Sequence, residues 1–237
     1  PLYSSAASDV YKRQVLVCII NQVCDMYVAP YFQMTDADKV LDFIKSNPFG
    51  ILVASQSNIP LASHIPFWLE ERDGSYFLTG HLSIANELAS VLEKADQVLV
   101  IFQGSHGYIS PSWYEKQNVP TWNYQAVHIY GSAALLSGPE LEAHVKELMD
   151  SYESNIPGGR KYEDMTADYR EKELRGIKGF RIKIENVEAA YKLSQNRNEK
   201  DHANIIEQLK KSANPHDHEL AKLMEENRPT QTQKAGL

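Results

Sequence analysis

The chain has 237 residues, of which 43% are hydrophobic and 23% charged, and its formal net charge is −7. This composition favours one folded domain with appendages and excludes wholesale disorder. The acidic charge argues against nucleic-acid binding through the overall field, although a local basic patch stays compatible with it. Both cysteines, Cys18 and Cys24, precede Met26, so the rest of the sequence has no disulfide framework or zinc-ligand spacing. This usage is typical of a reducing, cytoplasmic location.

The first residues differ in character from the rest of the chain. Their longest apolar run, Val15 to Ile20, is too short to cross a bilayer, and no small-residue cleavage site follows it. Because residue 1 is proline, we expect Met26 to be the true start and 1–25 to be a non-native leader. The remainder is expected to form a domain over 26–200 and a C-terminal helical segment with a frayed tail over 201–237.

The first expected elements are a helix and three strands. Thr35 opens a helix that stops at Asn47-Pro48, with Asp38 completing a variant capping box. The expected strands are Phe49–Ser55, Leu61–Leu69 and Tyr76–Thr79. Pro66 predicts an edge position or a bulge for the second strand.

A helix is expected next, over Ser83 to Asp96, with Ser83 as its N-cap. It follows the third strand through Gly80 and His81. The free amides and the dipole at such a helix start favour an anion, so this junction is a candidate phosphate seat. An ordinary capped helix is the alternative interpretation.

Two further strands, Gln97–Gln103 and Gln125–Leu136, flank a stretch of about twenty residues that resembles neither strand nor helix. That stretch is rich in tryptophan, tyrosine and short polar groups. The composition suits the wall of a binding site, where flat rings supply area and a few donors fix orientation. A well-packed surface loop explains it equally well.

The rest of the chain adds helices and two more strands. Phe180–Glu185 alternates between apolar and charged residues, which is typical of a half-exposed strand, and a last strand follows over Glu188–Leu193. The expected helices are Pro139–Ser154, Met165–Gly176, Asp201–Lys211 and Glu219–Asn227. About seven short, mostly sequential strands do not alternate regularly with helices, which excludes a doubly wound sheet. The sequence predicts a mainly β fold with flanking helices, an antiparallel sheet closing into a small barrel.

Seven strings of the sequence resemble the PaiB-type FMN-binding negative transcriptional regulators. They are MYVAPYF, NPFGILV, SHIPF, GHLSIAN, IFQGSHGYISPSWY, VPTWNYQAVHIYG and KLSQNR. The resemblance covers roughly Met26 to Glu226. It implies the FMN-binding split β-barrel fold, a homodimer and FMN as cofactor, and it also supports Met26 as the start.

The resemblance also selects cofactor-binding candidates, whose chemistry matches what FMN needs. Ser83, His81 and the amides ahead of Asn86 would seat the phosphate, and Ser63 and His64 would border the flavin. Trp122 and Asn123 would supply a stacking face and an amide. Lys192, Gln195 and Arg197 form a late polar segment, in which Arg197 could pair the phosphate or the pyrimidine carbonyls.

Other site chemistries have less support. The histidines at 64, 81, 106 and 128 invite a metal, but they lack helical pair spacing and a nearby acidic partner, so no metal is predicted. A hydrolase triad is unsupported because no nucleophile elbow is present. Between Arg160 and Lys183, eight basic residues outnumber five acidic ones. That stretch is the candidate phosphate-facing stripe for DNA, and a solvated surface is the alternative.

Two functions therefore stay open on the sequence. The first is an FMN-binding negative transcriptional regulator, whose partner is either DNA or a regulatory protein. The second is a flavin-dependent oxidoreductase that passes electrons from NAD(P)H to a small acceptor. Since the flavin would carry the chemistry, no catalytic residue is predicted for either.

Overall fold

A computed structural model describes residues 26–228 of the chain. The predicted leader, 1–25, and the end of the predicted tail, 229–237, lie outside the described residues. The described part divides into two units. Unit 1 contains residues 44–102 and 128–187, and unit 2 contains residues 26–43, 103–127 and 188–228.

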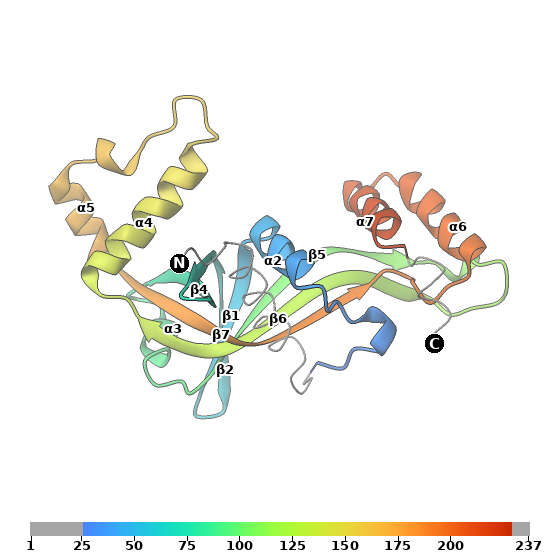
Figure 1. Cartoon of the computed structure of the whole chain (residues 1–237), viewed down its shortest axis with the longest axis horizontal. Coiled ribbons are helices and arrows are strands. Elements are labelled where there is room, and N and C mark those ends of the chain that lie inside the picture. The colour runs from blue at the N-terminus through green and yellow to red at the C-terminus, as the bar shows by residue number, and fades with distance from the viewer. Residues whose placement is uncertain (1–25, 229–237) are drawn as a thin grey trace, which may run out of the picture. The chain divides into compact units, whose positions relative to one another are not determined.

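Seven strands form one sheet in the order β2-β1-β5-β6-β7-β4-β3 (Figure 1). The strands are β1 (Phe49–Gln56), β2 (Ile59–Pro66), β3 (Trp68–Arg72), β4 (Ser75–Ser83), β5 (Val98–Ile109), β6 (Thr121–Leu135) and β7 (Ile177–Lys192). β1 pairs antiparallel with β2 and β5, and β4 pairs antiparallel with β3 and β7. The predicted mainly β class is therefore confirmed. The end strands β2 and β3 do not pair with each other, so the barrel is split and not closed.

Helices and short 3-10 turns fill the connections. The α-helices are α2 (Ala37–Ser46), α3 (Glu87–Val91), α4 (Gly138–Glu153), α5 (Ala167–Leu174), α6 (Glu199–Lys210) and α7 (Pro215–Glu226). The 3-10 turns are η1 (Pro30–Phe32), η2 (Pro111–Trp113) and η3 (Tyr162–Asp164). Within the described residues, no helix is long and apolar enough to span a membrane.

Several predicted boundaries were wrong because strands continue through polar residues. The predicted strand Leu61–Leu69 is two strands, with Phe67 between them. Gly80 to Ser83 belong to β4, and the short α3 starts only at Glu87, so the helix expected from Ser83 is absent there. The two late strands are one, β7.

The predicted long aromatic loop was also wrong. β5 extends to Ile109 and β6 begins at Thr121, so only 110–120 connect them, with η2 inside. The strand pattern was missed because this part of β5 carries glycine and small polar residues, which have weak strand propensity. The start of α2 differs as well: the Lys39 amide donates to Asp36 Oδ1 at 3.2 Å, so the cap is Asp36 in place of Thr35.

β2 lies at one end of the sheet order, as its proline predicted. Pro60 and Pro66 pair with Ser55 and Phe49 of β1. Residues 60 and 66 have even spacing, so their nitrogen atoms point to the same edge of the strand. That edge is the open one, because the opposite edge carries the ladder to β1.

The core of unit 1 is built around three phenylalanines. The Phe67 ring lies 5.5 Å from that of Phe102 and 6.3 Å from that of Phe180, both at steep interplanar angles. Glycine makes room for the rings, since a Cβ at Gly50 would lie 2.8 Å from the Phe102 ring. Edge-to-face contacts of this kind add to the free energy of burying the rings.

In unit 2, α6 and α7 lie side by side (Figure 1). Their buried side chains include Leu209, Leu220 and Met224. A Cβ at Gly107 of β5 would come within 2.8 Å of the Leu220 side chain, so glycine permits this close packing. Lys210 Nζ of α6 forms an ion pair with Glu225 Oε1 of α7 at 2.6 Å.

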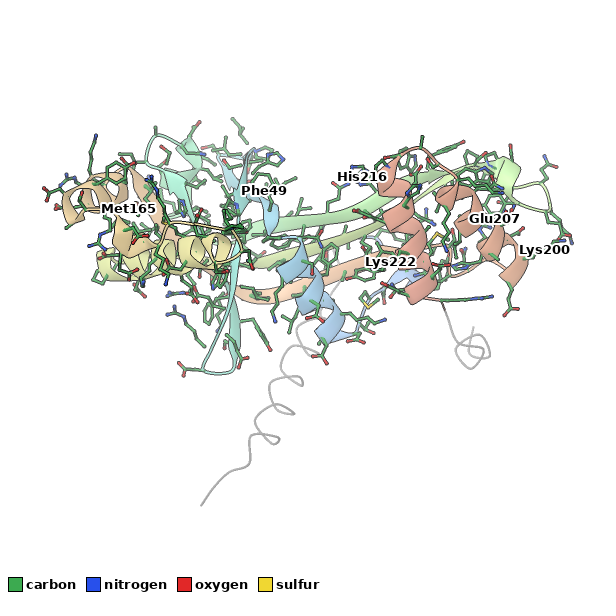
Figure 2. All side chains as sticks on the ribbon, turned by 90° about the horizontal axis from the view of Figure 1, so that it is seen from above. Phe49, Met165, Lys200, Glu207, His216 and Lys222 are labelled. Carbon is green, nitrogen blue, oxygen red and sulfur yellow. The ribbon has the colours of Figure 1, made fainter. Side chains whose placement is uncertain are left out.

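We expect Phe180→Ala to lower the free energy of unfolding by about 3–5 kcal/mol, because it removes a fully buried ring and leaves a cavity. Phe49→Ala is the matched control, since Phe49 is 64% exposed at the start of β1 (Figure 2). That change should cost less than about 0.5 kcal/mol. Urea titration followed by circular dichroism measures both, and equal losses would contradict the described core.

Candidate functional site

Asn86 organises the candidate residues at the end of β4 in unit 1. Its Oδ1 accepts the Leu88 amide at 3.0 Å, which makes it the N-cap of α3, and its Nδ2 donates to Ser63 Oγ at 2.9 Å. Ser83 Oγ accepts the Ala85 amide at 3.2 Å. The structure thus brings together three predicted residues, Ser63, Ser83 and Asn86, around one turn. The predicted phosphate site relied on free amides at the start of a long helix. Because α3 has only five residues and its Leu88 amide is already bonded to Asn86, fewer free amides are present there than expected.

Ser63 and His64 were predicted to border the same ligand, but they leave β2 on opposite faces because successive strand residues alternate. Ser63 is half-buried and faces Asn86. His64 is exposed, and its ring stacks on that of Phe49 at 6.2 Å. One small group on a single face of β2 could therefore contact only one of them.

His81 of β4 faces α4. Its Nδ1 lies 3.3 Å from Nε2 of His144, which is only 3% exposed. One imidazole must donate and the other accept, so the accepting ring has to be neutral. Burial lowers the pKa of His81. Burial, and after it the neighbouring His81 and Arg181, lower the pKa of His144 to about 4, while Glu70 acts in the opposite direction.

The candidates in β6 of unit 2 also divide between two faces. Trp122 is 53% exposed, and its ring lies 6.0 Å from Tyr108 and 6.3 Å from His106. Asn123, the next residue, is fully buried. The structure therefore presents Trp122 as part of an exposed aromatic surface, together with Tyr108 and His106, and turns Asn123 to the other side.

Asn123 and Ser194 form a reciprocal pair. Asn123 Nδ2 donates to Ser194 Oγ at 3.0 Å, and that hydroxyl donates to Asn123 Oδ1 at 3.1 Å. Ser194 has a φ of +61°, a left-handed conformation that is uncommon for serine. Such outliers persist only where the surroundings hold them, and they are frequent at functional sites.

Lys192 and Arg197 line a pocket of ≈180 Å³ together with Asn123 and Ser194. Lys192 Nζ donates to Thr121 Oγ1 at 2.6 Å. The guanidinium of Arg197 lies 4.9 Å from the centre of the Tyr114 ring. The pocket therefore collects cations, hydroxyls and amides within unit 2.

The side chain of Gln195 does not line the pocket of Lys192 and Arg197 but bonds the backbone of its own turn. Its Nε2 donates to the Tyr191 carbonyl, and its Oε1 accepts the Leu193 amide at 2.7 Å. Both ends of the side chain are thus used by the backbone. Gln195 holds the turn that carries Lys192 and Arg197.

The residues present fit an FMN on the chemistry of their donors. FMN offers a phosphate dianion, ribityl hydroxyls and a flat ring. Considered by itself, unit 1 has hydroxyl and amide groups around Asn86. Unit 2, considered by itself, has two cations in a pocket and an exposed indole. These are the group types that bind a phosphate, a polyol and a flat ring.

Three residues of these surroundings were missed in the sequence. Thr121 and Ser194 contact predicted residues, and Tyr108 packs edge-on against Trp122. Thr121 could have been found, because it lies two residues before Asn123 in an alternating strand and so shares its face. Ser194 lies inside the string KLSQNR, but its left-handed backbone conformation has no signal in the sequence.

Three of the eight basic residues of the predicted stripe are paired with acids in unit 1. Arg175 binds Glu171 at 2.8 Å, and Lys178 binds Glu93 at 2.6 Å. Arg181 Nη1 lies 3.1 Å from Glu140 Oε1. These contacts reduce the field that the stripe presents to a phosphate backbone. Across residues 26–228, no three histidine, cysteine or acidic side chains gather in a way that could hold a metal ion.

Comparison with known proteins identifies relatives along most of the chain. The family described as "Putative FMN-binding domain" matches residues 26–186. The "Protease synthase and sporulation protein PAI 2" of Bacillus subtilis (strain 168) is 43% identical over 201 residues. The match covers 85% of this chain and 97% of that protein.

Two solved structures share the fold. A FAD and heme binding protein from Mycobacterium smegmatis superposes with a TM-score of 0.52 at 18% identity, covering 68% of this chain and 73% of that one. The flavocytochrome Anf3 from Azotobacter vinelandii has a TM-score of 0.52 at 19% identity, covering 75% and 78%. At these identities the likeness concerns the fold alone, and it confirms the predicted split barrel.

We expect Asn86→Ala to destabilise the protein by about 1–2 kcal/mol, because it removes the cap of α3 and the bond to Ser63 together. Asn86→Asp keeps a cap acceptor and loses only the donor to Ser63, so it should cost less. Chemical denaturation of both variants measures the difference. If the two variants are equally unstable, the cap is not the main contribution of Asn86.

His144 should make stability fall in acid. Its pKa is about 4 in the folded chain and near 6.5 when unfolded, so between these values the unfolded chain binds the extra proton. The free energy of unfolding should therefore decline as pH falls from about 6.5 to about 4.

Unfolding midpoints across this pH window test that dependence. In His144→Gln the decline should be shallower, whereas in His106→Gln, at an exposed site, it should match the parent. An unchanged slope in His144→Gln would contradict the assignment.

Proposed function

This chain belongs to the FMN-binding domain family and is an FMN-binding protein, and we propose that it acts as a homodimeric negative regulator of transcription. The observation that supports the regulatory role is the match with the Bacillus subtilis protein, whose name is "Protease synthase and sporulation protein PAI 2". Because the match covers 97% of that protein and 85% of this chain, the similarity extends beyond the domain of residues 26–186.

FMN supplies one- and two-electron redox chemistry and a strong visible chromophore when bound. We propose that Asn86, Ser63 and Ser83 offer polar contacts in unit 1, whereas His64, on the opposite face of β2, and His81, which faces His144, lie outside this group. In unit 2, Lys192 and Arg197 offer positive charge beside Asn123, and Trp122 offers a separate stacking face on the other side of β6. Asn123 and Gln195 support the turn that links these two cations. Asn123 bonds the Ser194 hydroxyl, and Gln195 accepts the Leu193 amide.

The homodimer is supported by the exposed aromatic surface formed by His106, Tyr108 and Trp122. Aromatic residues are enriched in the buried centres of protein interfaces. The exposed Val119 precedes this group in the connection to β6 and adds apolar area. A second copy of the chain would cover these side chains.

Regulation through a protein partner or through the state of the flavin has more support than direct DNA contact. Ion pairs of Arg175, Lys178 and Arg181 with acids lower the free positive charge of the candidate stripe, which has eight basic residues. The net charge of −7 also disfavours direct contact with the negatively charged DNA backbone.

The test is an absorption spectrum of the protein with FMN, followed by anaerobic NADH or NADPH and then air. We expect a perturbed flavin band that stays oxidised, because a regulator needs the flavin as a bound ligand and not as an electron carrier. Light scattering on the same sample should give twice the chain mass of 26.9 kDa.

Other outcomes would redirect the proposal. A band that bleaches with the nicotinamide and returns in air would replace the regulator by the oxidoreductase. A measured mass equal to that of one protomer would contradict the proposed dimer. Free FMN as a reference sample controls for slow non-enzymatic reduction.

A further inference from the structure

The pocket between Thr121, Lys192 and Arg197 in unit 2 carries charge that its own walls do not neutralise. Its lining comprises two cations, two hydroxyl and two amide side chains, and the rings of Tyr31 and Phe32. None of these described lining residues is acidic. This pocket therefore has the composition of an anion site.

Lys192 and Arg197 differ from other basic residues of unit 2 in the groups that they contact. Lys200, Lys210 and Lys211 each reach a carboxylate at 2.6 Å. Lys192 contacts instead the Thr121 hydroxyl and, at 5.7 Å, the Phe32 ring. Arg197 contacts the Tyr114 ring. Contacts with hydroxyls and aromatic faces leave the charge of both side chains uncompensated.

Both cations also keep donors for a ligand. An ammonium group has three donors, of which Thr121 takes one, and a guanidinium has five in a planar fork that suits an oxyanion. Burial, and then the neighbouring Arg197, lower the pKa of Lys192. An anion between the two side chains would remove this mutual repulsion.

The walls hold the two cations in place before any ligand arrives. Gln195 clamps the turn from Tyr191 to Leu193, and the Arg197 amide donates to the Ser194 carbonyl at 3.0 Å. The left-handed Ser194 is fixed by the fully buried Asn123. A strained residue held by a buried polar partner supports a functional pocket.

We propose that this pocket binds a small oxyanion, a phosphate or carboxylate group, through Lys192 and Arg197, with Thr121 beside them. Its volume of ≈180 Å³ lies below the range of about 300–1,000 Å³ typical of sites for whole drug-sized ligands. It therefore takes one acidic group and not an entire flavin. The inference uses two residues proposed for FMN, but it rests on unit 2 alone and not on the regulatory role.

The test is calorimetric titration of inorganic phosphate into the flavin-free full chain at constant ionic strength. We expect saturable binding, with an apparent Kd raised about tenfold or more in the double variant Lys192→Met with Arg197→Gln. The charge-matched control is Lys200→Met with Lys222→Gln, on the surfaces of α6 and α7 (Figure 2). This control should bind phosphate as the parent does.

Two results would overturn the anion pocket. One is the absence of saturable phosphate binding in the parent chain, and the other is equal binding in the two double variants. Circular dichroism of both variants shows whether they are folded. If the cation variant is unfolded, the single change Lys192→Met replaces it, because this side chain keeps its length.

A second arm separates the two sources of the acidic group. If bound FMN blocks phosphate while riboflavin does not, the pocket holds the phosphate of the cofactor. If FMN-loaded protein still binds phosphate, the pocket holds the acid of a separate small molecule. Both results support the anion site, and neither depends on whether the protein regulates transcription.

Discussion

Alternation along β2 and β6 decides which side chains can act together. Two neighbouring pairs, Ser63 with His64 and Trp122 with Asn123, each divide between the faces of a strand. In each pair one residue is drawn inward and takes part in a polar network, while the other presents a ring to solvent. A string that resembles one recognition motif in the sequence is therefore two surfaces in the structure, and each surface has to be considered with its own neighbours.

The basic side chains of unit 2 differ in whether a carboxylate lies close enough to neutralise their charge. Most cations on α6 and α7 are neutralised by nearby carboxylates, as expected for exposed helices. Lys192, at the end of β7, and Arg197, in the turn that follows, contact a hydroxyl and an aromatic face, neither of which carries a negative charge. The partner chemistry, more than the number of basic residues, distinguishes a surface made for solubility from one available to an acidic ligand.

The antiparallel fold, most helices and the cofactor could be predicted from the sequence, because hydrophobic periodicity and rare aromatic strings are local features. Three things could not. The ends of β4 and β5 were missed because Gly80 and Gly104 lack the propensity of strand residues, although the sheet includes them. The contact of His81 with His144 joins residues 63 positions apart, which no local pattern reveals. The engagement of Gln195 by its own turn depends on backbone geometry, so the family resemblance of its segment suggested a ligand contact instead.

The prolines of β2 have a consequence for how copies of this chain can meet. Pro60, Ala62, His64 and Pro66 have the same parity, so their nitrogen atoms share the open edge of the sheet, and the two prolines supply no N–H there. A strand from another molecule would find donors only in the middle of this edge and none at its two ends. The two prolines therefore disfavour edge-to-edge pairing of β2 with a strand of another molecule. Copies of the chain are expected to associate through side-chain contacts and not through this strand edge.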